Sequence, residues 1–279
     1  MTEHIKQIPP PEITRALVNS GYLIESRVCG VLADRGWRPT LNHLYKKTAV
    51  DSKAEYGEID VLGVQLYVLR KQQVKKTYLV AIHLYCECKN NSQPIVFIEP
   101  RNKRPIGGHF GHTGNIKVLD SQGHWNGLRA FIHSKISTQY CTFQAKGNGW
   151  LACQNPELHK SLEGIGHAIK YFSSSLEDRN IRIDIHIPVA IFQGDLYKFY
   201  VDRNNRLIKI NEACLRKEYF SKSSSEETMY INVVTEGYLK TYLNKLEKHF
   251  DKCVCVPGFA TEKIGISPRK RVFKFRVTT

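Results

Sequence analysis

The apolar residues near the start of the chain follow a helical period and then a strand-like one. Their spacing predicts a helix over residues 14–35, with Gly36 placed to end it. The apolar positions that set this period are Ile24, Val28, Val31 and Leu32. A β-prone run, LYKKTAV, occupies 44–50. The Pro-rich, polar residues 1–13 are expected to form a flexible N-terminal arm.

Two further β-prone runs follow. A polar, turn-like segment, DSKAEYG, separates LYKKTAV from EIDVLGVQLYVL at 58–69, and this pattern predicts an antiparallel hairpin or meander. The next run, TYLVAIHLYCECK at 77–89, is apolar on both faces over most of its length. Such a run is typical of a central strand that is covered on both sides.

The second half of the chain begins with a stretch of weak periodicity. Residues 101–127 are rich in Gly, His and basic residues, which predicts a long loop within a loop-rich insertion near 101–150. An amphipathic helix is predicted over 156–174. The remaining predicted elements are strands at 185–192 and 196–202, joined tightly by QGD, a strand at 229–235 and a helix at 236–250.

The order of these elements indicates the fold class. A helix, three strands, a helix and a strand predict an α/β domain, with a mixed central β-sheet flanked by helices. We assign this core to residues 14–205. Residues 206–279 are interpreted as a C-terminal strand–helix extension with a basic tail.

Composition narrows the classes of function. The chain has 41 Lys and Arg against 26 Asp and Glu, a formal net charge of +15. Because a field of this sign attracts polyanions, nucleic acid is the leading partner class, although a basic housekeeping protein would show the same balance. No apolar run is long enough to cross a bilayer and no secretory signal is recognised, so we expect a cytoplasmic protein without membrane contact. The eight cysteines lack zinc-site spacing and are expected to be buried and free.

The stretch LYCECKNN, at 84–91, concentrates candidate chemistry at the end of the predicted central strand. Side chains two positions apart share a face of a strand, so Glu87 and Lys89 project together and Cys86 and Cys88 point the other way. The cysteine face continues through purely apolar positions, namely Leu84, Ile82 and Val80. The Glu87–Lys89 pair is therefore either an ion pair that emerges into solvent or part of a polar site.

Two further acids favour the second interpretation. Asp60 lies inside the apolar run that contains GEIDVLG, and Glu25 lies at the edge of the apolar stripe of the first helix. Three acids and a lysine thus occur at semi-buried positions of consecutive elements. Carboxylate clusters of this kind are what a divalent-cation site requires.

These residues resemble the motif of the PD-(D/E)xK nuclease superfamily, which has the restriction-endonuclease-like fold. The resemblance rests on Glu25 in a helix, Asp60 in EID on the following hairpin, and Glu87 and Lys89 in ECK. It covers roughly residues 20–90, and the later helix and the IPVAIF strand would complete the core. The sequence departs from the family pattern in having no proline before Asp60.

The resemblance implies a role for each of these residues. Asp60, Glu87 and the backbone carbonyl of Cys88 would bind Mg²⁺ or Mn²⁺, and Glu25 would contribute through a water on the metal or a second ion. Lys89 would orient the attacking water, stabilise it as hydroxide, or neutralise charge on the phosphorane, and we expect the cation to lower its pKa. Glu58, which shares the strand face of Asp60 in a regular strand, is a rival ligand that we expect at the rim of the site.

Several basic residues and histidines are candidates for contact with nucleic acid. On the predicted helix at 156–174, His167 and Lys170 follow Glu163 at helical spacing, and either they contact substrate phosphate or they form a solvated face. The other candidates are Arg101, Lys103 and Arg104 in the predicted loop and Arg269, Lys270 and Arg271 in the tail. As a set, four histidines suggest zinc, but the spacing of His109, His112, His124 and His133 fits no metal template.

The expected function follows from the resemblance and the charge. We expect a metal-dependent nuclease that hydrolyses phosphodiester bonds in DNA, an endonuclease in restriction, defence or repair. Because cutting both strands calls for two active sites, a homodimer is compatible with this function. The alternatives are a non-catalytic nucleic-acid-binding subunit of a larger complex and a basic protein-interaction scaffold whose acid cluster is structural.

Overall fold

The structure, a computed structural model, describes twelve ranges of the chain. They are residues 8–20, 22–47, 55–71, 76–91, 93–99, 111–114, 136–174, 182–201, 205–220, 226–254, 259–264 and 275–276. The basic candidates Arg101, Lys103, Arg104, Arg269, Lys270 and Arg271 lie outside these ranges.

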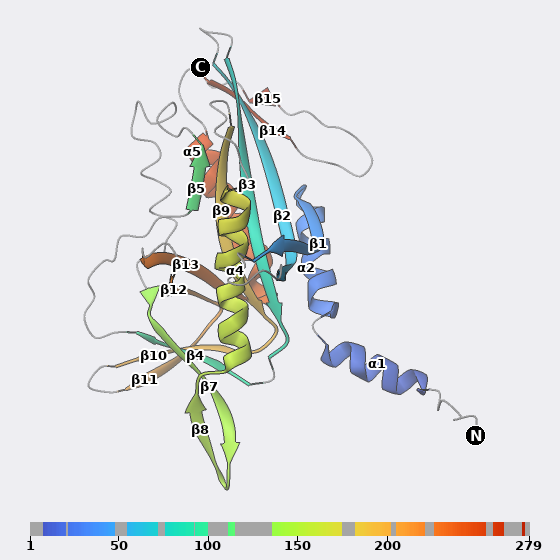
Figure 1. The fold of residues 1–279 in the computed structure, drawn as a ribbon, viewed down its shortest axis with the longest axis vertical. Helices are drawn as coiled ribbons and strands as arrows, with labels where there is room; N and C mark the ends of the chain where they lie inside the picture. The colour runs from blue at the N-terminus through green and yellow to red at the C-terminus, as the bar shows by residue number, and fades with distance from the viewer. Residues whose placement is uncertain are drawn as a thin grey trace.

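Within these ranges, ten strands form the larger of two sheets (Figure 1). Its strand order is β15–β14–β2–β3–β9–β13–β12–β6, with β1 paired to β2 and β5 paired to β9. The strands are β1 (Arg38–Lys46), β2 (Tyr56–Lys71), β3 (Lys76–Lys89), β5 (Gly111–Gly114), β6 (Ile136–Ser137), β9 (Arg182–Phe192), β12 (Glu212–Phe220), β13 (Glu226–Thr235), β14 (Phe259–Ile264) and β15 (Phe275–Arg276). Since β2 is antiparallel to β3 and β9 is parallel to β3, the sheet is mixed, and β3 is the central strand predicted.

A smaller sheet lies at the lower end of the molecule in Figure 1. Its order is β11–β10–β4–β7–β8. These strands are β4 (Ile95–Glu99), β7 (Gln139–Lys146), β8 (Gly149–Cys153), β10 (Leu196–Tyr200) and β11 (Arg206–Ile210). The connection QGD does lead from β9 to β10, but the two strands belong to different sheets. Both edges of β9 are already occupied, by β3 on one side and by β13 and β5 on the other, so β10 pairs with β4 and β11 instead.

The prediction of a loop-rich insertion near 101–150 is wrong for the last part of that range. Residues 139–153 form the antiparallel β7–β8 hairpin, in which Lys146 pairs with Gly149. Gly147 has φ +57°, as the first central residue of a tight two-residue turn requires. The turn consists of Gly147 and Asn148, and Gly149 already belongs to β8.

Five helical segments accompany the sheets in the described ranges. They are α1 (Pro10–Asn19), α2 (Tyr22–Asp34), α4 (Pro156–Ser174), the 3₁₀ turn η3 (Glu236–Tyr238) and α5 (Leu239–Val254). The bounds of α4 match the prediction, but the single helix predicted over 14–35 is divided in two. Ser20 takes an extended backbone at the break, where the sequence Ser-Gly favours a helix end. Because α1 begins at Pro10, it also takes in the last residues of the expected arm.

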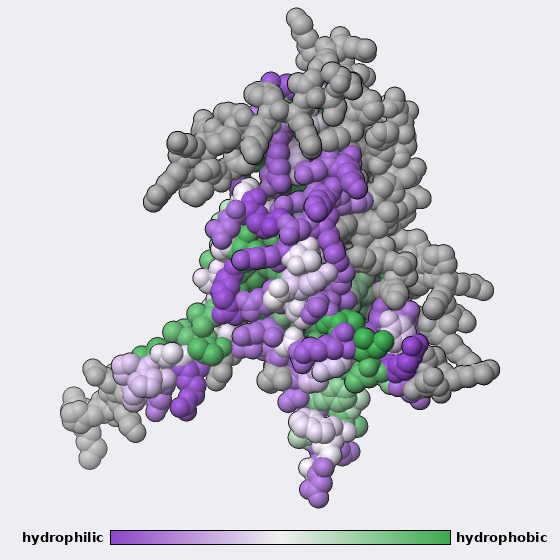
Figure 2. All heavy atoms as spheres, turned by 180° about the vertical axis from the view of Figure 1, so that it is seen from behind, coloured by the Kyte–Doolittle hydropathy of each residue, from purple (hydrophilic) through white to green (hydrophobic). Residues whose placement is uncertain are grey.

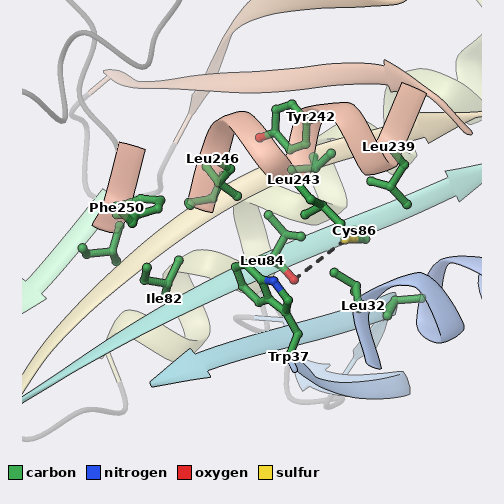
Figure 3. Packing of buried hydrophobic residues seen from close by; sticks show 14 of the residues in the cluster. Leu32, Trp37, Ile82, Leu84, Cys86, Leu239, Tyr242, Leu243, Leu246 and Phe250 are labelled. Carbon is green, nitrogen blue, oxygen red and sulfur yellow. Dashed lines mark hydrogen bonds between the residues drawn. The ribbon is translucent and has the colours of Figure 1, made fainter. Parts of the chain in front are cut away.

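The two faces of the larger sheet bury separate apolar clusters, so the molecule is a layered α/β structure. On one face, α5 and α2 pack against β3, with Leu243 and Leu246 of α5 pointing toward Ile82 and Leu84 (Figure 3). Cys86 belongs to this cluster and is fully buried, which confirms the predicted apolar face of β3. On the opposite face, α4 covers the second cluster.

Candidate functional site

The candidate site lies where β2 and β3 part. Their antiparallel ladder runs from Lys71 opposite Lys76 to Val61 opposite Cys86. Beyond this point β2 continues beside β1 and β3 continues beside β9. The next residue on each strand is one of the predicted site residues, Asp60 on β2 and Glu87 on β3. The sequence therefore brings two acids to the opening between two strands.

The carboxylate of Asp60 bridges this opening. Its Oδ2 accepts a hydrogen bond from the backbone N–H of Cys88 at 2.6 Å. A backbone donor in a sheet needs a partner, and here a side chain provides one after the ladder has ended. The main chain of β3 thus fixes the position of this carboxylate at the edge of the apolar core.

Lys89 completes a compact charged group with the two acids. Its Nζ lies 2.7 Å from Glu87 Oε1 and 3.8 Å from Asp60 Oδ2. The side chain of Lys89 is 33% exposed, whereas that of Glu87 is only 8% exposed. The predicted pairing of Glu87 with Lys89 on one face of β3 therefore exists, with the lysine on the solvent side.

Glu25 of α2 faces the same group. Burial raises the pKa of Glu25, and the negative charges of Asp60 and Glu58 raise it further, while Lys89 lowers it. An electrostatic influence of this kind requires proximity, so the structure brings Glu25 near the Asp60–Lys89 pair. Glu58 is exposed and lies beside the site rather than in it.

Glu87 is the most perturbed acid of the group. Burial, followed by the charge of Asp60, raises its pKa to about 7, although Lys89 and a hydrogen bond from Ser161 act in the opposite direction. Three acids around a single lysine leave an excess of negative charge in a partly dry place. A divalent cation would relieve this excess, and the carboxylate and carbonyl oxygens are hard donors of the kind that Mg²⁺ prefers. The donor types and the charge therefore fit a cation.

The three acids do not form a preassembled metal centre. Among the described residues, no three His, Cys, Asp or Glu side chains lie close enough together to hold one ion. In this arrangement Lys89 occupies the space between the two carboxylates. Burial lowers the pKa of Lys89, but the charges of Glu87 and Asp60 outweigh it and the net pKa is raised. The lowered pKa expected beside a cation concerns the metal-loaded site and stays a prediction.

A cavity of about 430 Å³ adjoins Glu87, a volume within the ordinary range for ligand sites (~300–1,000 Å³). One wall is α4, and the other is the β1–β2 hairpin. Its lining residues are Tyr45, Lys47, Glu55, Gly57, Glu58, Glu87, Lys160, Ser161, Glu163, Gly164 and His167. His167 lies in the wall of this cavity, whereas Lys170, one turn further along α4, is not a lining residue, and contact of either with substrate phosphate stays a prediction.

Tyr45 and Ser161 are site residues that sequence reasoning missed. Tyr45 is buried beside Gly57, where any Cβ would overlap its ring, and its hydroxyl oxygen lies close to Gly164. Burial and the charge of Glu87 raise the pKa of this phenol to about 12, so it is a neutral hydrogen-bonding group at neutral pH. Ser161 lies about 120° around α4 from His167, so the polar stripe of that helix does not point to it, and its contact with Glu87 depends on how α4 docks.

Comparison with known proteins gives no relative: no family model, curated protein or solved structure matches this chain. Of the helices in the described ranges, none combines the length and the apolar character that crossing a bilayer requires. Of the four histidines considered for zinc, only His112 falls within a described range, on β5.

Proposed function

We propose that this chain is a metal-dependent nuclease that hydrolyses phosphodiester bonds in DNA, as an endonuclease in restriction, defence or repair. The observation that carries the proposal is the convergence of Asp60, Glu87 and Lys89 where β2 and β3 part, with Glu25 beside them. The order α2–β1–β2–β3–α4–β9, in which β9 is parallel to β3, supports it. This is the connectivity that the resemblance to the PD-(D/E)xK superfamily implies for its core.

In the proposed reaction, a bond from a water oxygen to phosphorus forms as the bond from phosphorus to one ester oxygen breaks. Asp60, Glu87 and the carbonyl of Cys88 would hold Mg²⁺, which when bound supplies positive charge at the phosphate and makes a nearby water more acidic. Lys89 keeps a positive charge at the solvent side of the site, where it can donate hydrogen bonds to the phosphate oxygens that gain negative charge. Ser161 fixes the Glu87 carboxylate against α4.

Cleavage of supercoiled plasmid tests this proposal. With Mg²⁺ or Mn²⁺, the wild-type protein should nick or linearise the plasmid, and EDTA should abolish the reaction. Asp60→Ala and Lys89→Ala should lower the rate about 100-fold or more, in the range seen when groups that stabilise a transition state are removed. Asp34→Ala, which changes an exposed acid at the end of α2, is the matched control and should cut like wild type. Equal cutting by all four proteins would show contamination and overturn the assignment.

One observation favours the alternative of a non-catalytic nucleic-acid-binding subunit. The ammonium of Lys89 lies between Glu87 and Asp60, and ion pairs of this kind can neutralise an acid pair without any metal. Calorimetric titration with Mn²⁺ distinguishes the two functions. The nuclease should bind Mn²⁺ and lose this binding in Asp60→Asn, whereas a binding subunit should bind DNA with no Mn²⁺ dependence and with no change in Asp60→Asn.

A further inference from the structure

The β7–β8 hairpin projects from the body of the molecule. It extends beyond the lower end of the fold in both views (Figures 1 and 2). Every residue from 144 to 152 is exposed, and the side chain of Trp150 is 65% exposed. Ala145 lies directly opposite Trp150 in the ladder, and so small a neighbour leaves much of the indole uncovered. Trp150 therefore presents a large aromatic surface to the solvent near the tip of the projecting hairpin.

The hairpin is a built projection rather than a loose loop. Its base continues the smaller sheet, where Cys141 pairs with Val96 and Tyr140 packs on Phe97 in the second apolar cluster. The Thr142 hydroxyl also bonds to the carbonyl of Cys153 across the two strands at 3.2 Å. The ladder then runs without interruption to the turn at Gly147. The tip is therefore presented in a fixed direction.

Charge argues for a polyanionic partner. Residues 136–155 contain no Asp or Glu, and Lys146 stands at the turn of the hairpin. The whole chain carries +15. A protein with this charge repels a second copy of itself at long range and attracts phosphate. Because Ala145 is opposite Trp150 and side chains alternate along a strand, Lys146 leaves the other face of the hairpin, next to its turn. The indole offers a surface on which a base can stack, and Lys146 offers a cation at the tip, where a nucleic-acid backbone that passes over the turn can meet it.

The hairpin is also connected to the candidate site by a short stretch of the chain. Two residues after β8, Asn155 caps α4 by accepting hydrogen bonds from the N–H groups of Glu157 and Leu158 at 2.9 and 3.1 Å. Five residues into α4, Ser161 contacts Glu87. The path from Trp150 to Ser161 is at most roughly 30 Å, from about 3.3 Å per extended residue and 1.5 Å per helical residue. This corresponds to roughly eight stacked nucleotides at about 3.4 Å each.

We propose that the β7–β8 hairpin is a nucleic-acid-binding element on which Trp150 stacks against an unpaired DNA base and Lys146 contacts the backbone. This inference rests on the proposed function, because it gives the hairpin the task of holding the DNA that the site cuts. It also narrows the substrate class to DNA with an unpaired segment within about eight nucleotides of the scissile bond. Stacking tolerates any base, so the hairpin selects strand structure rather than sequence.

Binding measured without cleavage tests the inference. In EDTA, the dissociation constant of a fluorescein-labelled 30-nucleotide single strand should rise roughly 5- to 100-fold in Trp150→Ala, the range expected for losing one stacked base. Leu151→Ala is the matched control, because its side chain leaves the opposite face of the same exposed strand, and it should change the constant less than twofold. Part of the intrinsic tryptophan fluorescence should be quenched by the strand in wild type and not in Trp150→Phe. All variants should melt like wild type, since the hairpin tip is exposed.

The possible results separate this inference from the proposed function. Trp150-dependent binding without any cleavage supports the hairpin assignment and overturns the nuclease proposal. Cleavage and binding that are unchanged in Trp150→Ala overturn the hairpin assignment and leave the nuclease proposal intact. Two further results would contradict the inference: an equal loss of affinity for blunt duplex and for single strand in Trp150→Ala, or no binding of any DNA at low salt. A Trp150→Ala variant that changes only the sedimenting mass would make the hairpin a contact between proteins and would also overturn it.

Discussion

Neutralising Glu87 should stabilise the metal-free protein. Glu87 is 6% exposed, and burial together with the charge of Asp60 raises its pKa from 4.5 to about 7. In the unfolded chain the same carboxyl group ionises near its ordinary pKa. Between pH 4.5 and 7 the unfolded state therefore releases a proton that the folded state retains, and the free energy of unfolding falls as the pH rises.

The magnitude follows from the two pKa values. The difference between 4.5 and about 7 corresponds to roughly 3 kcal/mol, at about 1.4 kcal/mol for each factor of ten in proton affinity. Glu87→Gln removes this penalty because the amide carries no charge at any pH. The variant should match wild type near pH 4.5 and exceed it by up to roughly 3 kcal/mol above pH 7. For a chain of this size the melting temperature should rise by roughly 6 °C.

Urea unfolding in EDTA at pH 5, 6, 7 and 8, followed by circular dichroism, measures the effect. Glu58→Gln is the control, because Glu58 is an exposed acid on the wall of the same cavity, and its stability should follow the wild-type pH dependence. A difference between Glu87→Gln and wild type that does not grow with pH, or a variant less stable at pH 8, would refute the reasoning. It would mean that the ion pair with Lys89 outweighs the burial of the charge.

Three further outcomes are expected. Gly57→Ala should lower the melting temperature and cost about 1–3 kcal/mol, because a Cβ there overlaps the buried Tyr45 ring, whereas Gly30→Ala on the open face of α2 should stabilise by about 0.5–1 kcal/mol. Mg²⁺ should raise the urea midpoint of wild type but not that of Asp60→Asn, since only a ligand of the folded state stabilises it. Burial raises the thiol pKa of Cys86, Cys88 and Cys214, that of Cys214 to about 12. Because the thiolate is the reactive form, iodoacetamide at pH 8 should leave these three cysteines unmodified until urea is added. Mass spectrometry of the alkylated peptides measures this.

The local patterns predicted the centre of the fold well. The period of two in β3 separates Cys86 from Glu87, and burial of the cysteine face enforces it in the structure. The bounds of α4 were predictable because Pro156 opens the helix and an amphipathic pattern fills it. These features depend on neighbours in the sequence, so the sequence shows them directly.

The sequence-based predictions were wrong where contacts between distant segments determine the structure. Taken alone, the glycine-containing sequence around the β7–β8 turn resembles a loop, but β7 pairs with β4 in the folded chain. The QGD connection favours a hairpin locally, yet β9 has no unoccupied edge at its end. Within the site, the shared face of Glu87 and Lys89 followed from alternation alone, whereas the contacts of Tyr45 and Ser161 require the docking of α4 against β1 and β3. These pairings and contacts depend on tertiary packing, which the pattern of a single segment does not show.

The parting of β2 and β3 also bears on the order in which the protein folds. The two strands form a hairpin whose eleven paired positions run from Lys71 and Lys76, next to the connection, to Val61 and Cys86 at the far end. If pairing proceeds outward from the connection, where the loop to be closed is shortest, Asp60 and Glu87 meet last. Their mutual repulsion then enters after most of the apolar ladder has formed. It should speed unfolding and leave the folding rate almost unchanged, so that kinetic φ-values near zero are expected at both acids.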